Sequence, residues 1–181
     1  MASRPESNDR PDAPFGPPDC PWEPMSSDSP MPESVFDCGG KLNGEKVYVG
    51  RVYDDEDKSY LIGTAIPSKG LCTYVTKDLK VKTSNNYEIL TISCGEPLVF
   101  KPKDWESNLL FVAGGDMDKC LYCGRVVEND NTYFGWADKD DQTVYIPRDH
   151  ESKVLEGYNI LIHQYLDRLC ICPMPPHTPP F

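Results

Sequence analysis

Two copies of the same set of short motifs run through the chain, and this repetition constrains the fold more than any single residue does. The copies match in three places, which are VYVGRV at residues 47–52 with LYCGRV at 121–126, YEIL at 87–90 with YNIL at 158–161, and Trp22 with Trp105. Landmarks that recur in the same order indicate a repeat architecture. We therefore expect two copies of one structural unit, the first at residues 22–97 and the second at residues 98–172.

The repeated segments are made of residues that favour β-strands. Residues 46–53 and 143–146 are rich in β-branched and aromatic side chains, and turn-forming pairs such as Asn43-Gly44 bound segments of this kind. Helical periodicity is weak except at residues 158–169, where a strand could lead into a short helix. The sequence predicts an all-β protein of two tandem, pseudo-symmetric antiparallel units with extended Pro-rich N- and C-terminal tails.

Proline marks both ends of the expected folded part. Residues 1–21 contain six prolines and residues 173–181 contain five. Segments of this composition bury too little apolar surface to fold alone and favour extended, polyproline-like conformations. Two alternatives follow for these tails. They are either unstructured ends or docking peptides for protein partners, with Phe15 or Phe181 as an apolar anchor.

The charge of the chain argues against several classes of partner. The formal net charge is −11 at pH 7, whereas binding to nucleic acid or to an anionic membrane depends on clusters of lysine and arginine. Residues 1–20 contain no apolar run of the signal-peptide type, and no later stretch approaches the length of a membrane span. We therefore expect no nucleic acid partner, no membrane span and a cytoplasmic location.

Eight cysteines raise the alternatives of disulfides and of a metal site. Without a secretory signal, free thiols are favoured over disulfides. Cys120 and Cys123 have zinc-knuckle spacing, but they lie in an expected strand, where side chains three residues apart point to opposite faces. Cys170 and Cys172 would share a face if extended, yet no histidine nearby in the sequence completes a ligand set. We expect buried thiols, and neither a metal nor another cofactor.

Recognisable catalytic motifs are missing from the sequence. It contains no nucleophile elbow, no glycine-rich phosphate loop and no zinc-protease helix. His150 is flanked by Asp149 and Glu151, and carboxylates raise the pKa of a histidine, but no nucleophile is placed to use it. The acidic runs at 54–57 and 138–141 lack the spaced ligands of an EF-hand and are expected at hairpin tips. We therefore expect a protein that is not an enzyme.

Glycine pairs complete the set of landmarks. Gly39-Gly40 and Gly114-Gly115 precede the VYVGRV and LYCGRV segments, and a proline-glycine turn follows at residues 66–70. Together with the tryptophans, these landmarks resemble the DM nine repeat, which occurs in tandem in invertebrate mannose-binding lectins and resembles the front module of the natterin toxins. The resemblance implies an all-β pair of packed units, often a homodimer, without enzymatic activity and with one sugar pocket per repeat.

The resemblance also implies which residues would hold a sugar. In the lectins of this family, an aspartate shortly before the Tyr-Val-Gly-Arg strand and a lysine in a Pro-Gly-Lys turn bind the sugar hydroxyls. Asp116 stands at the aspartate position of the second copy, whereas Lys41 stands there in the first. Neither copy has the turn lysine, because residues 61–64 read LIGT and residues 133–136 read YFGW. The first copy is therefore expected not to bind sugar.

The second copy remains the expected carbohydrate site. Lys139 or Lys58 could replace the missing lysine, and Trp136 could stack its indole on the apolar face of a sugar ring. Core packing is the alternative role for Trp136. The expected carbohydrate-binding residues are thus Asp116, Trp136 and Lys139.

Four residues of the repeated motif are expected to be structural, as are the two tryptophans. Gly50 and Gly124 interrupt apolar strands, and a glycine there marks a bulge or a close backbone approach. Arg51 and Arg125 follow them and are expected at equivalent places, with their guanidinium groups held by carboxylates or carbonyls.

Two hypotheses about function remain. One is a lectin-like, non-enzymatic module that binds mannose-type glycans. The other is a structural or interaction protein that keeps the fold, binds no sugar, and docks through its Pro-rich tails into a larger assembly, such as a cytoskeletal or ciliary one.

Overall fold

β-Strands make up nearly all the regular structure of the computed structural model, in which residues 22–92, 98–107, 109–148, 152–154 and 156–164 are described. We call residues 22–92 the first half and residues 98–164 the second half. The Pro-rich tails lie outside the described residues, as does the part of residues 158–169 that follows Gln164.

The strands follow the segments of β-branched and aromatic residues. The first half contains β1 (Trp22–Met25), β2 (Lys41–Leu42), β3 (Glu45–Lys46), β4 (Tyr48–Asp54), β5 (Ser59–Ile66), β6 (Leu71–Val75), β7 (Val81–Ser84) and β8 (Tyr87–Leu90). A 3-10 turn, η1 (Pro67–Lys69), precedes β6. The second half contains β9 (Leu98–Pro102), β10 (Val112–Gly115), β11 (Cys120–Glu128), β12 (Asn131–Asp138), β13 (Thr143–Tyr145), β14 (Lys153–Val154) and β15 (Asn159–His163).

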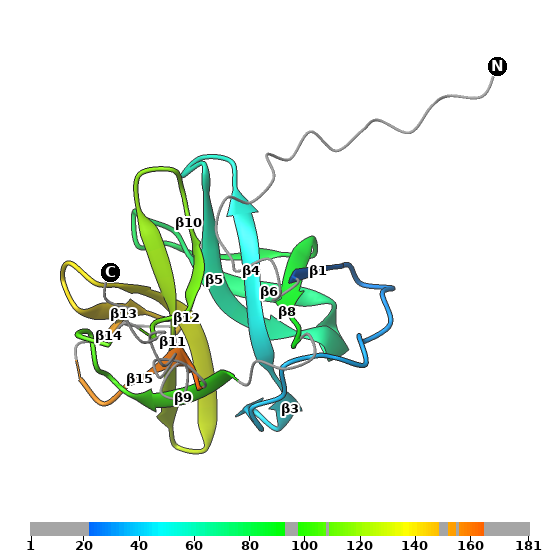
Figure 1. The fold of residues 1–181 in the computed structure, drawn as a ribbon. Helices are drawn as coiled ribbons and strands as arrows, with labels where there is room; N and C mark the ends of the chain where they lie inside the picture. The colour runs from blue at the N-terminus through cyan, green and yellow to red at the C-terminus, as the bar shows by residue number, and fades with distance from the viewer. Residues whose placement is uncertain (1–21, 93–97, 108, 149–151, 155, 165–181) are drawn as a thin grey trace, which may run out of the picture.

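Hydrogen bonds join most of these strands into one branched antiparallel sheet. Its main path runs β1-β8-β4-β5-β10-β11-β12-β13-β14, with β6 and β7 branching from β5, and β15 and β9 branching from β11. The strands β2 and β3 form a separate hairpin. β10 pairs with both β5 and β11 and so connects the two halves, which lie side by side in Figure 1. The predicted all-β, antiparallel fold is confirmed.

The long hairpins of the two halves have the same register around a pair of glycines. Gly50 of β4 faces Gly63 of β5. Gly124 of β11 faces Gly135 of β12. On the other side, β4 pairs with β8 and β11 pairs with β15, again at these two glycines. Superposition of the full units at 22–97 and 98–165 stays a prediction.

Close packing explains why glycine stands at the centre of each hairpin. A Cβ atom at Gly124 would lie 2.5 Å from Val144 Cγ2. A Cβ atom at Gly50 would lie 2.9 Å from both Ala65 Cβ and Cys72 Sγ. The backbone therefore approaches its neighbours too closely at both positions to leave room for a side chain.

The two halves share a hydrophobic core. Its larger cluster contains Ile62 and Leu61 from the first half together with Phe111 and Phe134 from the second, all with no exposed surface. Thr64 on β5 strengthens this seam, since its hydroxyl donates to Phe134 O at 3.0 Å and accepts from Phe134 N at 2.8 Å. The halves are therefore packed together rather than linked loosely.

Trp22 packs against the arginine of the first repeated motif. It lies on β1 opposite Leu90 of β8, and its ring centroid is 4.4 Å from Arg51 Cζ. Tyr60 contacts the same guanidinium, also at 4.4 Å. Trp22 thus covers a charged group that is almost fully buried.

Phe100, rather than Trp105, takes the place of Trp22 in the second half. Phe100 on β9 faces Leu161 of β15, and its ring centroid is 4.6 Å from Arg125 Cζ. Trp105 lies in the following loop, where its indole Nε1 donates to Tyr158 Oη at 3.0 Å. The match of the two tryptophans by residue type alone is therefore wrong in position, because another aromatic side chain serves to cover Arg125.

Candidate functional site

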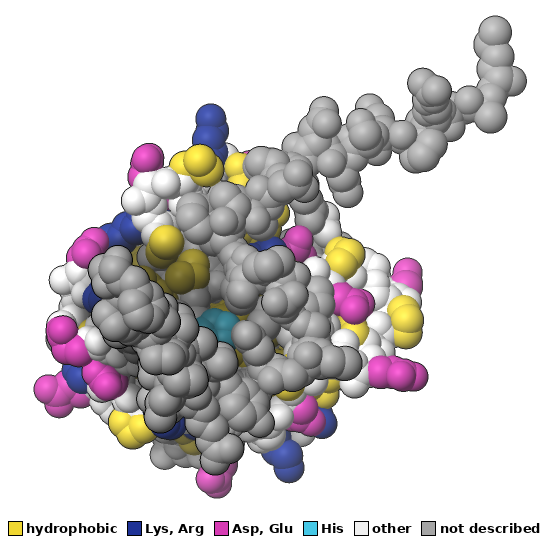
Figure 2. All heavy atoms as spheres, in the orientation of Figure 1, with side chains coloured by type: hydrophobic (Ala, Val, Ile, Leu, Met, Phe, Trp, Pro, Cys, Tyr) yellow, Lys and Arg dark blue, Asp and Glu magenta, His cyan; other side chains and the backbone are white. Residues whose placement is uncertain are grey.

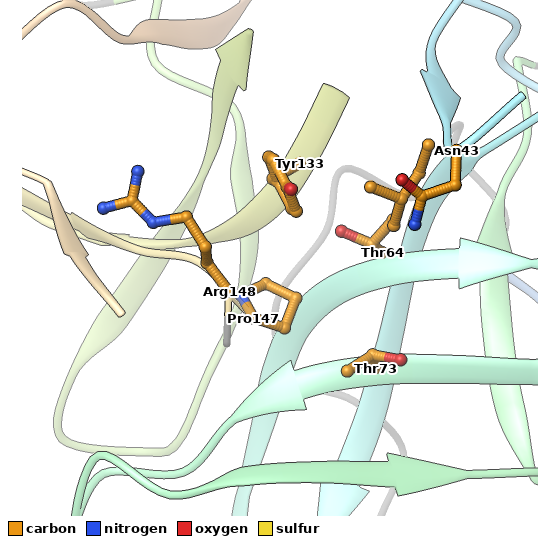
Figure 3. Close-up of a pocket in the computed structure, with 7 residues that line it drawn as sticks. Asn43, Thr64, Thr73, Tyr133, Pro147 and Arg148 are labelled. Carbon is orange, nitrogen blue, oxygen red and sulfur yellow. The ribbon is translucent and has the colours of Figure 1, made fainter. Parts of the chain in front are cut away.

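A small cavity lies where the two halves meet. Its volume is about 160 Å³. The residues around it come from both halves and are Asn43, Thr64, Thr73, Tyr133, Pro147 and Arg148, with Leu42 beside them (Figure 3). Thr64 and Thr73 face each other across β5 and β6. The site is thus built from a pair of adjacent strands in one half and from β12 and the segment after β13 in the other.

Polar but uncharged groups dominate the interior of this cavity. The Thr64 hydroxyl is already bonded to Phe134, so Thr64 contributes chiefly its methyl group. The hydroxyls of Thr73 and Tyr133 make no hydrogen bond to another described residue. Asn43 is positioned by a bond from its backbone N–H to Asn131 Oδ1 at 2.8 Å. Hydroxyl and amide groups both donate and accept, which suits a ligand with hydroxyl groups.

Arg148 borders the cavity without directing its charge into it. In Figure 3 its guanidinium points away from Tyr133 and Thr64. Its Nη1 donates to Glu128 Oε2 at 2.5 Å. The cavity therefore presents no charged group toward its centre among the residues that line it.

The matching place in the second half is filled by the protein itself. In the first half, Thr64 follows Gly63 and lies opposite Thr73. In the second half, Trp136 follows Gly135 and lies opposite Tyr145. The rings of Trp136 and Tyr145 stack with centroids 4.0 Å apart.

Trp136 belongs to the core of the protein. It is 6% exposed, and its indole Nε1 donates to Val75 O of the first half at 2.7 Å. Burial under Tyr145 leaves no open ring face for a sugar. Of the two roles expected for Trp136, core packing agrees with this geometry.

Asp116 is already surrounded by donors. Its Oδ2 lies 2.7 Å from Lys77 Nζ, and its Oδ1 accepts from the backbone N–H groups of Asp118 and Lys119 at 2.9 and 3.0 Å. The bond from the Lys77 ammonium, helped by the two backbone N–H groups, holds the pKa of Asp116 below its ordinary value despite partial burial.

The lysine beside Asp116 is therefore Lys77 and not Lys139. Lys139 is exposed in the turn after β12 and makes no ion pair with a described residue. The structure thus does not bring together Asp116, Trp136 and Lys139 as one open site. Sequence reasoning missed Lys77 because it lies 39 residues from Asp116, and no local motif signals a contact over that distance.

The acidic runs lie at hairpin tips. Asp54 Oδ1 accepts from the backbone N–H groups of Glu56 and Asp57, both at 3.0 Å, and so closes the turn between β4 and β5. Lys119 Nζ bridges Asp138 and Asp140 at 2.6 and 3.0 Å. Within the described residues, no group of three or more histidine, cysteine and acidic side chains is arranged to hold a metal ion.

The described cysteines are free thiols. Burial raises the pKa of Cys72 and of Cys123, and both have no exposed surface. Cys38 and Cys120 are partly exposed. The remaining four cysteines, and His150 and His177, lie outside the described residues. His163 on β15 packs edge-on against Phe111, with ring centroids 5.4 Å apart.

The surface agrees with the acidic composition. On the face in Figure 2, lysine and arginine side chains are scattered among aspartate and glutamate, and the described residues form no basic patch there. Within the described part of the chain, no helix has the length and apolar character needed to cross a membrane.

Comparison with known proteins adds a family and a structural neighbour. No curated protein matches the sequence. The structure is similar to the crystal structure of the nematode sperm cell motility protein MFP2B, with a TM-score of 0.59 and 15% sequence identity. The match covers 80% of this chain but only 44% of that one, so it shows a shared fold. The sequence profile of the DM9 repeat matches residues 41–155, and the chain therefore belongs to the DM9 repeat family.

Proposed function

We propose that the protein is a non-enzymatic carbohydrate-binding module that takes one mannose-type sugar residue in the cavity between Thr73 and Tyr133. The observation that carries this proposal is an opening beside Thr64 and Thr73, whereas Trp136 and Tyr145 fill the matching place in the second half. This proposal differs from the sequence-based expectation, which assigned the sugar to the second copy.

The chemistry and size of the cavity support a small hydroxylated ligand. At about 160 Å³, it is smaller than the roughly 300 to 1,000 Å³ typical of pockets for drug-sized ligands. The hydroxyls of Thr73 and Tyr133 are available to donate and accept, and the Tyr133 ring offers an apolar surface for the C–H groups of a sugar. One sugar residue at the end of a glycan would meet these groups.

The residues Asp116, Trp136 and Lys139 form the competing site. Asp116 would have to exchange its bond with Lys77 for bonds to the sugar, and Trp136 would have to leave its stack with Tyr145. Both changes would break interactions that the fold makes. We therefore propose that the glycan binds in the cavity between Thr73 and Tyr133.

Calorimetric titration with mannose and oligomannose tests the proposal. Wild-type protein should release heat at millimolar sugar. Thr73→Tyr should abolish binding, because it copies Tyr145 into the open cavity. Val81→Tyr is the matched control, since it adds the same ring at a position that is 45% exposed on the neighbouring edge strand, and it should bind as wild type does.

Asp116→Ala distinguishes the two sites. We expect this variant to bind sugar normally. Loss of binding in Asp116→Ala together with normal binding in Thr73→Tyr would move the site to the second half. Absence of heat from wild-type protein would favour the other hypothesis, an interaction protein, in which deleting residues 1–21 or 173–181 should release a protein partner.

A further inference from the structure

Arg51 shows how this fold accommodates an arginine in the middle of a half. Its guanidinium lies against the rings of Trp22 and Tyr60. Its Nε donates at 2.5 Å to Glu88 Oε2, on the residue directly opposite in the ladder. Its Nη1 also donates to Ala113 O at 3.5 Å. Arg51 is 4% exposed, and the Glu88 carboxylate neutralises its charge.

Arg125 has the same register but lacks the carboxylate. It faces Asn159 of β15, as Arg51 faces Glu88 of β8. Its Nε is buried and has no hydrogen-bond partner. Within the described part of the chain, the contact of its guanidinium is with the Phe100 ring, and it makes no ion pair. The expectation that both arginines are held by carboxylates or carbonyls therefore fails for Arg125.

The Cys38 thiol near Arg125 and the Asp37 carboxylate next to it in the chain do not supply the missing negative charge. Burial raises the pKa of the Cys38 thiol by more than the charge of Arg125 lowers it, so this thiol stays neutral near pH 7. The neighbouring Asp37 carboxylate is bound to Lys46, with Oδ2 2.5 Å from Nζ. The positive charge of Arg125 is thus not balanced by either neighbour.

An external oxyanion can satisfy this guanidinium. Arginine stays protonated in proteins, so the charge cannot be lost by deprotonation. The planar N–H groups match the two oxygens of a carboxylate, and bonds of this kind are among the strongest hydrogen bonds in proteins. Asn159 adds a neutral amide that can donate from the opposite strand. Arg125 is only partly buried, so a small ion can meet its exposed atoms although Nε itself is buried.

We propose that Arg125 binds the carboxylate of a small acidic ligand, which takes the place beside Arg125 that Glu88 takes beside Arg51. Phe100 backs the guanidinium, and Asn159 lies across from it. None of these three residues lines the proposed glycan cavity, so this site is independent of that function. The net charge of −11 repels anions at long range, and this repulsion is strongest at low ionic strength. Binding should therefore be modest.

Thermal unfolding of the full chain tests this site, with malonate and succinate as probes and sodium chloride added to keep the ionic strength constant. A ligand that binds only the folded state raises the melting temperature in a saturable way. Wild-type protein should show this rise. Arg125→Gln should weaken binding roughly tenfold or more, because it removes the charged donor.

Asn159→Glu is the more decisive variant. It keeps Arg125 and places a carboxylate where Glu88 stands in the first half. It should raise the melting temperature without ligand and remove the response to malonate. Because this variant retains the arginine, it keeps the test valid even if Arg125→Gln fails to fold.

Lys101→Gln is the control for a general loss of positive charge. Lys101 is exposed on β9, next to Phe100 in the chain, and its replacement should leave the response to malonate unchanged. The proposal is overturned if wild-type protein responds no more to either carboxylate than to chloride. It is also overturned if Asn159→Glu responds as strongly as wild type.

Discussion

Lys77 Nζ lies 2.7 Å from Asp116 Oδ2, so the turn after β6 in the first half is tied to the turn after β10 in the second. This ion pair gives the conspicuous aspartate of the second repeat a structural partner. It also lies at the same seam as the bond from Trp136 Nε1 to Val75 O. The side of the seam that the sequence marks as a sugar site is therefore occupied by contacts between the halves.

The Lys77 and Asp116 pair should add modest stability that disappears in acid. The folded-state pKa of Asp116 is lowered by Lys77, so the pair contributes at pH values above the unfolded-state pKa of about 3.9. That contribution is lost as the pH falls through the folded-state pKa. The side chains are 37% and 25% exposed, and we expect less than about 1 kcal/mol.

Urea unfolding of wild type and Asp116→Asn measures this contribution. The difference between them should be present near neutral pH and shrink at pH values below the unfolded-state pKa. An equal difference at both pH values would assign the effect to something other than the charge of Asp116.

The central glycines should resist replacement. Gly124→Val forces a side chain into Val144, whereas Gly50→Val meets Ala65 and Cys72 at somewhat longer distances. We expect losses of roughly 1 to 3 kcal/mol from overpacking, with the larger loss at Gly124. Chemical denaturation compares both variants with Val127→Ala, a change at an exposed position of β11 that should be nearly neutral. Unchanged stability in both glycine variants would contradict the packing account.

Trp136 should stabilise the fold rather than serve as a binding surface for a sugar. Trp136→Ala removes a stacked, buried ring and its bond to Val75, and large-to-small changes of this kind cost about 3 to 5 kcal/mol. A tryptophan that served only as a sugar platform would be replaced with little loss. Denaturation midpoints of wild type and variant decide between these two roles.

The Glu88 carboxylate should be needed to keep Arg51 in the core. Glu88→Gln leaves a buried guanidinium without its counter-ion, and breaking a buried pair in this way costs about 3 to 5 kcal/mol. Glu128→Gln is the matched control, because its pair with Arg148 is much more exposed, at 24% and 42%, and should lose less than about 1 kcal/mol. Equal losses would show that burial does not set the value of these pairs.

The sequence by itself determined the strands and the class of fold. The VYVGRV and YEIL motifs lie in or overlap β4 and β8, and LYCGRV lies within β11. These assignments rest on the alternation and residue type of short segments, which are local properties of the chain. The glycines of the motif also had a local signal, because each interrupts an apolar strand.

Only the tertiary structure decided which side chains meet. Lys77 pairs with Asp116, and Phe100 takes the position expected for Trp105. The open cavity lies beside Thr64 and Thr73 because these residues are small where Trp136 and Tyr145 are large. Contacts between residues that are far apart in the chain cannot be predicted from a local sequence pattern. Strand register and the packing of the two halves bring them together, and these depend on the whole sheet rather than on any one segment.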